Sequence, residues 1–403
     1  MNPNPPIVLL FTTFPKTSET FLQRDVAALQ AHGLNLRLYS LWGGGGEFRG
    51  LPVRSFNKWR LLPLFLFEIP WQCVRRPRLI RDLFEGVVTR PAPSFLNFWE
   101  NMLGAGFAGC FYRELQKDPP ALIHGAWAGA PATAGWTLWR MFGWRYSSGA
   151  HAYDIYEHGG DWWLLEKLRH ARFIHTSTDA ARRELEERGV PPAQIRVIRR
   201  GLDAFPVLKP LRPNRTPLRL ICIARLVQKK GLDYQLAIYA GLKDAGLAFE
   251  ARIIGDGPLQ AALEARAMAL GVADQVKFLG RMEQPQVFEQ LAWADVLLHT
   301  GIVAPSGDRD GLPNVIPEAM AAGVLVVTSP VSATTEAVRQ ERTGLVCDVD
   351  LPLAWRVALQ RLGTDDALAQ RLRLAARQWV EENYDAHKNT ARLAACFEEA
   401  AKG

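Results

Sequence analysis

The chain has 403 residues, of which 48% are hydrophobic and 22% charged. This composition is typical of a globular protein and excludes an intrinsically disordered one. A chain of this length exceeds what one hydrophobic core usually supports, so we expect two domains. The net charge is +7, and residues 1–205 hold all of it, with 25 Lys and Arg against 18 Asp and Glu; the remainder has 23 of each.

The cysteines and the first residues indicate a reducing compartment. The five cysteines are scattered and form no Cys-x-x-Cys pair, so we expect neither a disulfide framework nor a zinc site. The apolar run Ile7–Phe11 follows no basic region and is too short to cross a bilayer. We therefore expect a cytoplasmic protein without a secretion leader or a transmembrane helix.

The first forty residues predict alternating strands and helices. Ile7–Phe11 is a continuous apolar run, which is typical of a buried parallel strand. A helix should follow from Ser18 to about His32, capped by Thr17 or Ser18, and residues 34–41 should form the next strand. This order predicts an α/β sheet with right-handed crossovers and a ligand crevice at the carboxyl ends of its strands. The tetraglycine that follows, 43–46, has the composition of a mobile loop.

Residues 54–81 form an unusual basic and aromatic segment. It holds seven Lys and Arg residues against the single acid Glu68, and Trp59–Trp71 is rich in large apolar side chains. Such a segment suits the interface of an anionic membrane, but a core helix pair with a solvated basic edge remains an equal alternative. The basic residues form one cluster without a known nucleic-acid module, so we expect no nucleic-acid partner.

Two histidines stand at the ends of predicted strands in the first half. His124 ends the strand that begins at Leu122, and His151 follows the strand that begins at Tyr146. Asp154, three positions after His151, can orient the imidazole or can cap the helix that begins at Ile155. Both histidines are candidates for contact with a ligand at the sheet edge.

A second α/β domain should begin after a proline-rich linker, residues 204–217. Leu218–Ala224 reads as a buried strand, and the following loop brings Arg225 and Lys230 to a strand–helix junction. Two cations beside the positive end of a helix dipole are unfavourable unless an anion binds there, which points to phosphate recognition. Their neighbour Lys229 is expected to be solvated.

Residues 310–323 hold two acids, Asp310 and Glu318, at a predicted helix start. Helical spacing of apolar residues indicates that Pro313 or Asn314 opens the helix, which leaves unpaired N–H groups in a positively polarised seat for an anion. A carboxylate one turn into the helix can accept two hydrogen bonds from a vicinal diol. The pattern therefore suits a diphosphate joined to a ribose.

Several motifs together resemble glycosyltransferase family 4, whose members are retaining enzymes of the GT-B fold. The strongest are the two acids spaced as Glu-x7-Glu in the family, the Arg225/Lys230 loop and the turn Gly255–Pro258. The stretch Pro15–Phe21 is similar to enzymes of the family that build bacterial exopolysaccharides, such as those of the colanic-acid type. The chain departs from the family at Asp310, where the family usually has Glu.

The first half resembles the family at both histidines, and further departures occur near the domain junction. The family has a strand ending in His, and then a strand leading to His-Ala-x-Asp, as here at His151–Asp154. Arg200 stands where the family usually has Asn, and Ala224 where it has Gly. In the family the second of the two histidines faces the donor sugar.

The resemblance implies a GT-B fold, in which two Rossmann-like doubly wound domains face a central cleft and a C-terminal helix crosses back to the first domain. The expected boundaries are 1–203 for the acceptor-side domain, 204–217 for the linker, 218–375 for the nucleotide-sugar domain and 376–403 for the returning helix.

The resemblance also assigns roles to individual residues. His151, Asp310, Arg225 and Lys230 are the expected catalytic residues, with His151 and Asp310 at the transferred sugar and the two cations at the diphosphate. The expected donor-binding residues are Glu318, which holds the ribose, together with Gly255, Gly257, Gly280, Arg281, Gly311, Leu312, Pro313, Asn314 and Val315. The expected acceptor-side residues are Lys16, Ser18, Glu19, His124 and Asp154.

The implied activity is retaining transfer of a sugar from a UDP- or GDP-linked donor to a lipid-linked saccharide or other glycan of a surface polysaccharide. We identify no Asp-x-Asp metal motif and expect neither a metal ion nor a cofactor, because cations and a helix dipole can stabilise the departing diphosphate. The protein should lie peripherally on the inner face of the cell membrane. The alternatives are a nucleotide-sugar epimerase of the same fold and a membrane-associated scaffold with a weak site.

Overall fold

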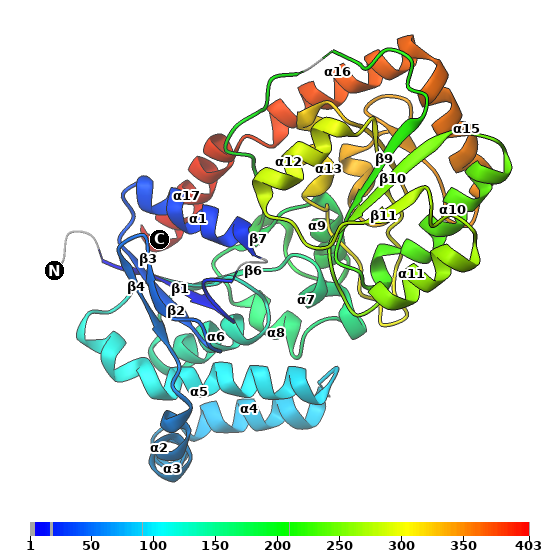
Figure 1. Cartoon of the computed structure of the whole chain (residues 1–403). Helices are drawn as coiled ribbons and strands as arrows, with labels where there is room; N and C mark the ends of the chain where they lie inside the picture. Colours follow the sequence, from blue (N-terminus) through cyan, green and yellow to red (C-terminus); the bar gives the residue numbers. More distant parts are fainter. Residues whose placement is uncertain (1–4, 17–18, 91, 209, 403) are drawn as a thin grey trace. The chain divides into compact units, whose positions relative to one another are not determined.

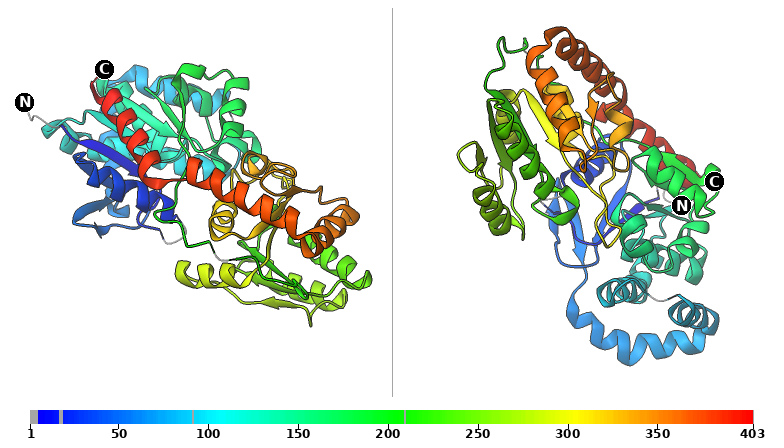
Figure 2. Two further views of the ribbon diagram at one scale, coloured as in Figure 1. Left: turned by 90° about the horizontal axis from the view of Figure 1, so that it is seen from above. Right: turned by 90° about the vertical axis from the view of Figure 1, so that its right-hand side faces the viewer.

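The computed structural model describes residues 5–16, 19–90, 92–208 and 210–402. The chain divides into two compact units, drawn in Figures 1 and 2. Unit 1 comprises residues 1–199 and 386–403, and unit 2 comprises residues 200–385. The proline-rich stretch 204–217 thus belongs to unit 2, and the last helix, α17, belongs to unit 1 (Figure 1).

Unit 1 is built on an eight-stranded sheet with the order β3-β4-β2-β1-β5-β6-β7-β8. All neighbouring strands pair in parallel except β3 and β4, which form an antiparallel hairpin. The strands are β1 Ile7–Phe11, β2 Leu36–Ser40, β3 Gly46–Phe48, β4 Leu51–Ser55, β5 Leu122–Gly125, β6 Tyr146–Gly149, β7 Ile174–Thr176 and β8 Ile195–Val197. The last residue of the tetraglycine therefore begins a strand, and the hairpin is an element that we did not predict.

Helices cover both faces of this sheet, which is why β1 is buried along its whole length. Ile7, Leu9 and Phe11 pack with α1 and α17, whereas Val8 and Leu10 pack with α5 and α6. Side chains of a strand alternate between its faces, so only a continuous apolar run can serve both layers. The longer helices are α1 Thr20–Ala31, α4 Pro77–Thr89, α5 Phe95–Lys117, α6 Ala130–Phe142, α9 Asp179–Glu187 and α17 Ala386–Lys402; α7 Tyr153–Tyr156 and α8 Leu164–Arg169 are short.

The basic aromatic segment is helical; part of it packs against α5 and α4, and many of its apolar side chains are exposed. Lys58–Arg60, α2 Leu61–Pro63, the π-helical Leu64–Glu68 and α3 Ile69–Arg75 follow one another directly and lead into α4. Among their apolar side chains Leu64 is buried, while Trp59, Phe67 and Val74 are 75%, 71% and 80% exposed. Large exposed apolar side chains that lie together on a surface indicate an interaction site.

Unit 2 is built on a six-stranded parallel sheet with the order β11-β10-β9-β12-β13-β14. The strands are β9 Leu218–Ile223, β10 Phe249–Ile254, β11 Val276–Phe278, β12 Val296–His299, β13 Leu325–Thr328 and β14 Leu345–Val346. The helices are α10 Leu232–Asp244, α11 Gln260–Ala269, α12 Gln284–Trp293, α13 Val315–Ala322, α14 Thr334–Ala337, α15 Pro352–Thr364 and α16 Asp366–Asn383.

The strand order of unit 2 defines where a ligand should bind. The chain runs outward from β9 through β10 to β11, and then starts again beside β9 with β12 and continues outward to β14. The order therefore reverses between β9 and β12. In open parallel sheets the crevice at the carboxyl ends of such neighbouring strands is the usual ligand site.

Candidate functional site

The loops after β9 and β12 meet at the switch point of unit 2 and bring opposite charges together. Lys230 lies at the end of the β9–α10 loop, and its Nζ is 2.5 Å from Oδ2 of Asp310. His299, the last residue of β12, places Nε2 3.6 Å from the same oxygen and Nδ1 3.1 Å from Oγ1 of Thr328. The two members of the Lys230–Asp310 pair are 12% and 16% exposed, so solvent screens the pair only in part.

The surroundings of Asp310 keep its carboxylate charged. Burial alone would raise the pKa of Asp310, but the Lys230 ammonium, His299 and Lys229 outweigh burial and hold the pKa well below its usual range. Burial lowers the pKa of His299, and Lys230 acts in the same direction. The imidazole is therefore neutral at pH 7, and the local charge is that of a carboxylate beside lysines.

Lys229 is not the solvated neighbour that we expected from the sequence. Its side chain is 9% exposed, and its Nζ lies 2.9 Å from Oδ2 of Asp308 and 3.6 Å from Oδ1 of Asp310. The backbone explains this placement, because the carbonyl of Lys229 accepts from the N–H of Ile302 and so holds the two loops side by side.

Our statement that the sequence contains no Asp-x-Asp metal motif was wrong. Asp308 and Asp310 have the Asp-x-Asp spacing that we overlooked in the sequence. Both carboxylates face ammonium groups, Lys229 and Lys230, so their charge is already compensated within the chain. No group of three or more His, Cys, Asp or Glu side chains in the described part of the chain is placed to hold a metal ion.

Glycine makes the close approach of these loops possible. At Gly231, which follows Lys230 and has φ +60°, an added Cβ would lie 1.9 Å from the carbonyl oxygen of Thr300. At Gly255, with φ +134°, a Cβ would lie 1.9 Å from the carbonyl oxygen of Ala224. A side chain at either position would force the loops apart and displace Lys230 or Arg225.

Helix α13 begins where the sequence predicted, with Asn314 at its N-cap. Arg200 Nη1 lies 3.4 Å from Oδ1 of Asn314, which adds a cation beside the helix start. Glu318 is buried, and its Oε1 accepts from Nε2 of Gln284 at 3.0 Å. Gly311, Leu312, Pro313 and Val315 complete the approach to the helix. The first N–H groups of such a helix have no intrahelical acceptor and can bind an anion.

The remaining donor-side residues lie on neighbouring loops. Arg225 is exposed, and within the part of the chain that the structure describes its guanidinium forms no ion pair. Gly257 has φ +157°, and a Cβ there would meet the backbone of Leu226. The carbonyl of Gly280 accepts from the N–H of Gly255 at 2.8 Å, and Arg281 follows as an exposed residue.

In unit 1, the hydrogen bonds of Asp154 decide whether its carboxylate orients the imidazole of His151. Its Oδ1 accepts from the N–H groups of His151 and Ala152 at 3.0 and 2.9 Å, and its Oδ2 accepts from the N–H of Ala128 at 3.1 Å. Burial raises the pKa of Asp154, and these three backbone hydrogen bonds oppose the increase. The carboxylate thus fixes the backbone of the loops after β5 and β6 rather than the imidazole.

The two histidines of unit 1 have different surroundings. His151 is buried with its ring edge-on to Trp127 and His175, at centroid distances of 5.3 and 5.0 Å. His124 is packed between Phe173 and Phe397 of α17, and burial lowers its pKa to about 3. His124 is therefore a neutral residue of the core, and its packing gives no support to the acceptor-side role that we expected.

The other acceptor-side residues lie at the start of α1. Lys16 Nζ pairs with Oε1 of Glu19 at 2.8 Å, and the lysine is 49% exposed. Glu19 stands at the N-cap of α1. Thr17 and Ser18 lie outside the described residues.

Sequence reasoning missed His299, Asp308 and Gln284 as parts of the site. His299 carried a signal, since it ends an apolar strand beside the predicted switch point. Asp308 carried the overlooked Asp-x-Asp spacing with Asp310. Gln284 carried no signal, because it is placed by a contact with Glu318, which lies many positions away along the chain.

Two α/β units built on largely parallel sheets, with a charged site at the switch point of the second sheet, correspond to the GT-B fold of glycosyltransferases. Solved structures support the fold across the chain. The lipopolysaccharide outer core galactosyltransferase WaaB has a TM-score of 0.72 at 14% identity, covering 98% of this chain and 99% of that one. HepE of Anabaena in complex with UDP-glucose has a TM-score of 0.70 at 16% identity, with the same coverage.

Two family models match successive parts of the sequence. "Glycosyltransferase Family 4" matches residues 18–204, and "Glycosyl transferases group 1" matches residues 207–379. The chain belongs to glycosyltransferase family 4.

Two of the curated relatives are named as biosynthesis glycosyltransferases of amylovoran and of colanic acid. The chain is 33% identical to the amylovoran biosynthesis glycosyltransferase AmsK of Erwinia amylovora over 211 residues; this match covers 52% of each chain. It is 33% identical over 218 residues to the putative colanic acid biosynthesis glycosyltransferase WcaL of Escherichia coli, which covers 53% of each. The chain spans about half the length of the curated relatives it matches.

Proposed function

We propose that this protein transfers a sugar from a nucleotide-diphosphate donor to a lipid-linked saccharide or other glycan of a bacterial surface polysaccharide. Family membership and the exopolysaccharide relatives support the reaction and its setting. UDP-glucose in the related structure of HepE supports a nucleotide-sugar donor.

The observation that carries the proposal is the Lys230–Asp310 pair beside the start of α13. In the proposed complex the diphosphate lies between the ammonium of Lys230, the guanidinium of Arg225 and the N–H groups of Asn314 and Val315. These groups stabilise the negative charge that develops on the leaving diphosphate. Glu318 binds the ribose hydroxyls, while Asp310 and, from unit 1, His151 contact the transferred sugar.

We propose a retaining reaction that needs no metal ion. Retention is the family's chemistry, and front-side attack is the route that requires no additional nucleophile. The surroundings of the two carboxylates support a reaction without a metal ion, because Asp308 and Asp310 are already neutralised by Lys229 and Lys230. A divalent cation at these carboxylates would meet two ammonium groups, which already supply the positive charge that a metal would bring.

We also propose that unit 1 binds the cytoplasmic face of an anionic membrane through residues 54–81. Trp59, Phe67 and Val74 are exposed there, and so are Arg75 and Arg78. Apolar side chains can enter the headgroup boundary while arginines meet anionic lipid. Among the described residues, no helix combines the length and the apolarity needed to cross a bilayer.

A donor screen tests the proposed reaction. Purified protein is incubated with a panel of UDP- and GDP-sugars, and protection against thermal unfolding and release of nucleoside diphosphate are measured. We expect one donor class to protect the protein and to be hydrolysed slowly. Epimerised donor in reactions without acceptor would establish the epimerase alternative, and failure of every donor to bind would establish the scaffold alternative.

A further inference from the structure

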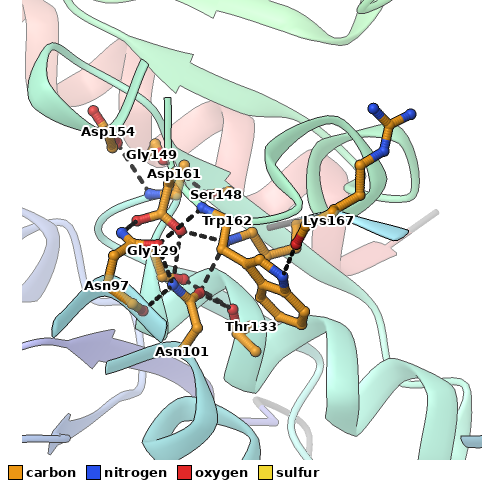
Figure 3. Close-up of polar contacts among 12 residues, drawn as sticks. Asn97, Asn101, Gly129, Thr133, Ser148, Gly149, Asp154, Asp161, Trp162 and Lys167 are labelled. Atoms are coloured by element: carbon orange, nitrogen blue, oxygen red, sulfur yellow. Dashed lines mark hydrogen bonds and ion pairs between the residues drawn. The ribbon is translucent and has the colours of Figure 1, made fainter. Parts of the chain in front are cut away.

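A buried polar cluster in unit 1 joins helix α5 to the loop that precedes α8 (Figure 3). Its centre is an ion pair between Nζ of Lys167 and Oδ1 of Asp161, at 2.8 Å, with side-chain exposures of 0% and 4%. A buried ion pair usually adds little stability compared with apolar residues of similar volume, because both charges lose their hydration. A buried ion pair more often serves to select one conformation, since each buried charge can occupy few alternative positions.

Helix α5 supplies the remaining hydrogen bonds of Asp161. Nδ2 of Asn97 donates to Oδ2 of Asp161, and Nδ2 of Asn101 donates to Oδ1, both at 2.9 Å. Asn97 and Asn101 are four residues apart and so lie on one face of the helix. Oδ1 of Asn97 accepts in turn from the N–H of Trp162 at 3.1 Å. The first turns of α5 are thus held to residues 161–162 by side-chain bonds in both directions.

The cluster extends to α6 through Asn101. Its Oδ1 accepts from Oγ1 of Thr133 at 2.5 Å and from Nζ of Lys167 at 3.0 Å. Gly129, at the N-cap of α6, lies so close that an added Cβ would be 2.8 Å from Oδ2 of Asp161. One carboxylate therefore meets three helices, and Figure 3 shows these side chains converging on it.

A second carboxylate continues the series of hydrogen bonds to His151. The N–H of Asp161 donates to the carbonyl oxygen of Asp154 at 3.0 Å. The side chain of Asp154 then accepts from the N–H groups of His151, Ala152 and Ala128. Hydrogen bonds joined through Asp161 and Asp154 consequently connect Asn101 in the first turns of α5 to the backbone N–H of His151.

The same part of α5 also carries apolar side chains on the surface. Phe95, Leu96 and Trp99 are 77%, 65% and 42% exposed. They precede and follow Asn97 in the sequence, so any movement of this part of α5 would move both the apolar surface and the polar cluster.

We propose that Asp161, held by Lys167 and Asn101, is a positioning residue that locks the first turns of α5 against the loop carrying His151. The inference rests on the proposed function, which places His151 at the transferred sugar. Locking the two elements fixes how an acceptor with an apolar carrier, guided by Phe95 and Trp99, approaches the imidazole. Asp161 itself contacts neither substrate.

Amide hydrogen exchange measures this positioning without any ligand. In Asp161→Asn, and in the milder Asn97→Ala, we expect the amides of His151 and Ala152 to exchange about tenfold faster, because their opening no longer requires the cluster to break. The matched control is Tyr39→Phe, which removes a buried hydrogen bond to Glu114 elsewhere in unit 1. Unchanged exchange at His151 and Ala152 in both cluster variants, or an equal increase in Tyr39→Phe, would overturn the inference.

Hydrolysis and binding measurements separate positioning from a general loss of stability. With UDP-glucose and GDP-mannose as probes, the cluster variants should hydrolyse the accepted donor about tenfold more slowly per folded molecule, while calorimetry with UDP and GDP gives wild-type affinity. A wild-type hydrolysis rate in a cluster variant whose melting temperature is lower would show a purely structural role. Failure of the wild type to bind either nucleotide would contradict the proposed function alone, because the exchange experiment still decides the inference.

Discussion

The Lys230 ammonium lies 2.5 Å from a carboxylate oxygen of Asp310, although the two residues are eighty positions apart in the sequence. Each comes from a loop at the carboxyl end of a strand, β9 or β12, on the two sides of the switch point of unit 2. The pair therefore concentrates opposite charges at the place where a parallel sheet receives its ligand.

Removing the ammonium should weaken binding of a nucleoside diphosphate. In Lys230→Ala we expect the affinity for UDP or GDP to fall about thirty- to hundredfold, which is the effect of losing one charge-assisted hydrogen bond to phosphate. The matched control is Lys243→Ala, because Lys243 is an exposed residue of α10 that bonds to the carbonyl of Gly271. Calorimetric titration measures both variants, and equal affinities in Lys230→Ala and wild type would remove Lys230 from the phosphate site.

Replacing the carboxylate of Asp310 should make the free energy of unfolding depend less on pH in the acid range. The folded-state pKa of Asp310 is depressed, so its contribution is fully present above the unfolded pKa of about 4 and is lost as the pH falls further. We expect Asp310→Asn to be less stable than wild type by about 3 kcal/mol at pH 7, because Lys230 loses its carboxylate partner and Lys229 keeps only Asp308. Urea unfolding at several pH values measures the difference, which should narrow below pH 4; a constant difference would contradict the pairing.

His124 should give the free energy of unfolding a measurable slope that begins at a higher pH than that of Asp310. Its folded-state pKa of about 3 lies below the ordinary value near 6.5. The stabilising contribution of the neutral ring is therefore complete above about pH 6.5, and is lost by about 1.4 kcal/mol per pH unit as the pH falls towards 3.

The variant His124→Asn can retain the bond to Ser147 but cannot take up this proton. Its free energy of unfolding should depend less steeply on pH between 6 and 4 than that of wild type, by about one proton. His158→Asn is the control, since His158 is exposed and has a positive φ that Asn tolerates. Equal slopes in His124→Asn and wild type would show that the buried ring is not held neutral.

The membrane proposal depends on arginines that the structure leaves exposed. Arg76 is a poor choice for mutation, because its guanidinium lies 4.7 Å from the Phe142 ring and bonds to Gln72. Arg75, Arg78 and Arg81 are exposed, so changing all three to Gln should reduce flotation with phosphatidylglycerol vesicles without lowering the melting temperature. Each cation near an anionic surface contributes about 1 kcal/mol.

A control variant with Arg183, Arg266 and Arg342 changed to Gln has the same change in net charge at exposed positions elsewhere. Flotation of this variant should match that of wild type at 0.1 M salt. If both triple variants lose binding to the same extent, the attraction comes from overall charge and the segment is not an anchor.

The sequence predicted those parts of the fold whose signal is local. Ile7–Phe11 is apolar throughout because two helical layers cover β1, and the start of α13 follows from Pro313 and Asn314. The β3–β4 hairpin escaped prediction because Gly44 to Gly46 favour a loop, and the strand character of β4 comes from pairing with β2.

The sequence singled out candidate site residues, but it did not indicate which side chains they contact. Arg225 and Lys230 stand out because basic residues at a helix start need an anion. Two contacts depend on packing between segments about sixty to eighty residues apart in the sequence. They are the burial of Lys229 against Asp308 and the hydrogen bond from Asn101 to Asp161. No periodicity within a segment encodes such contacts, so they required the structure.

The most direct measurement of the central claim is a crystal structure of the protein with UDP or GDP, whichever protects it against unfolding. We predict that the diphosphate lies within hydrogen-bond distance of Nζ of Lys230 and of the N–H groups at the start of α13, with the ribose on Glu318. A diphosphate bound anywhere else, with the Lys230–Asp310 pair unchanged and Glu318 still bonded to Gln284, would contradict the account.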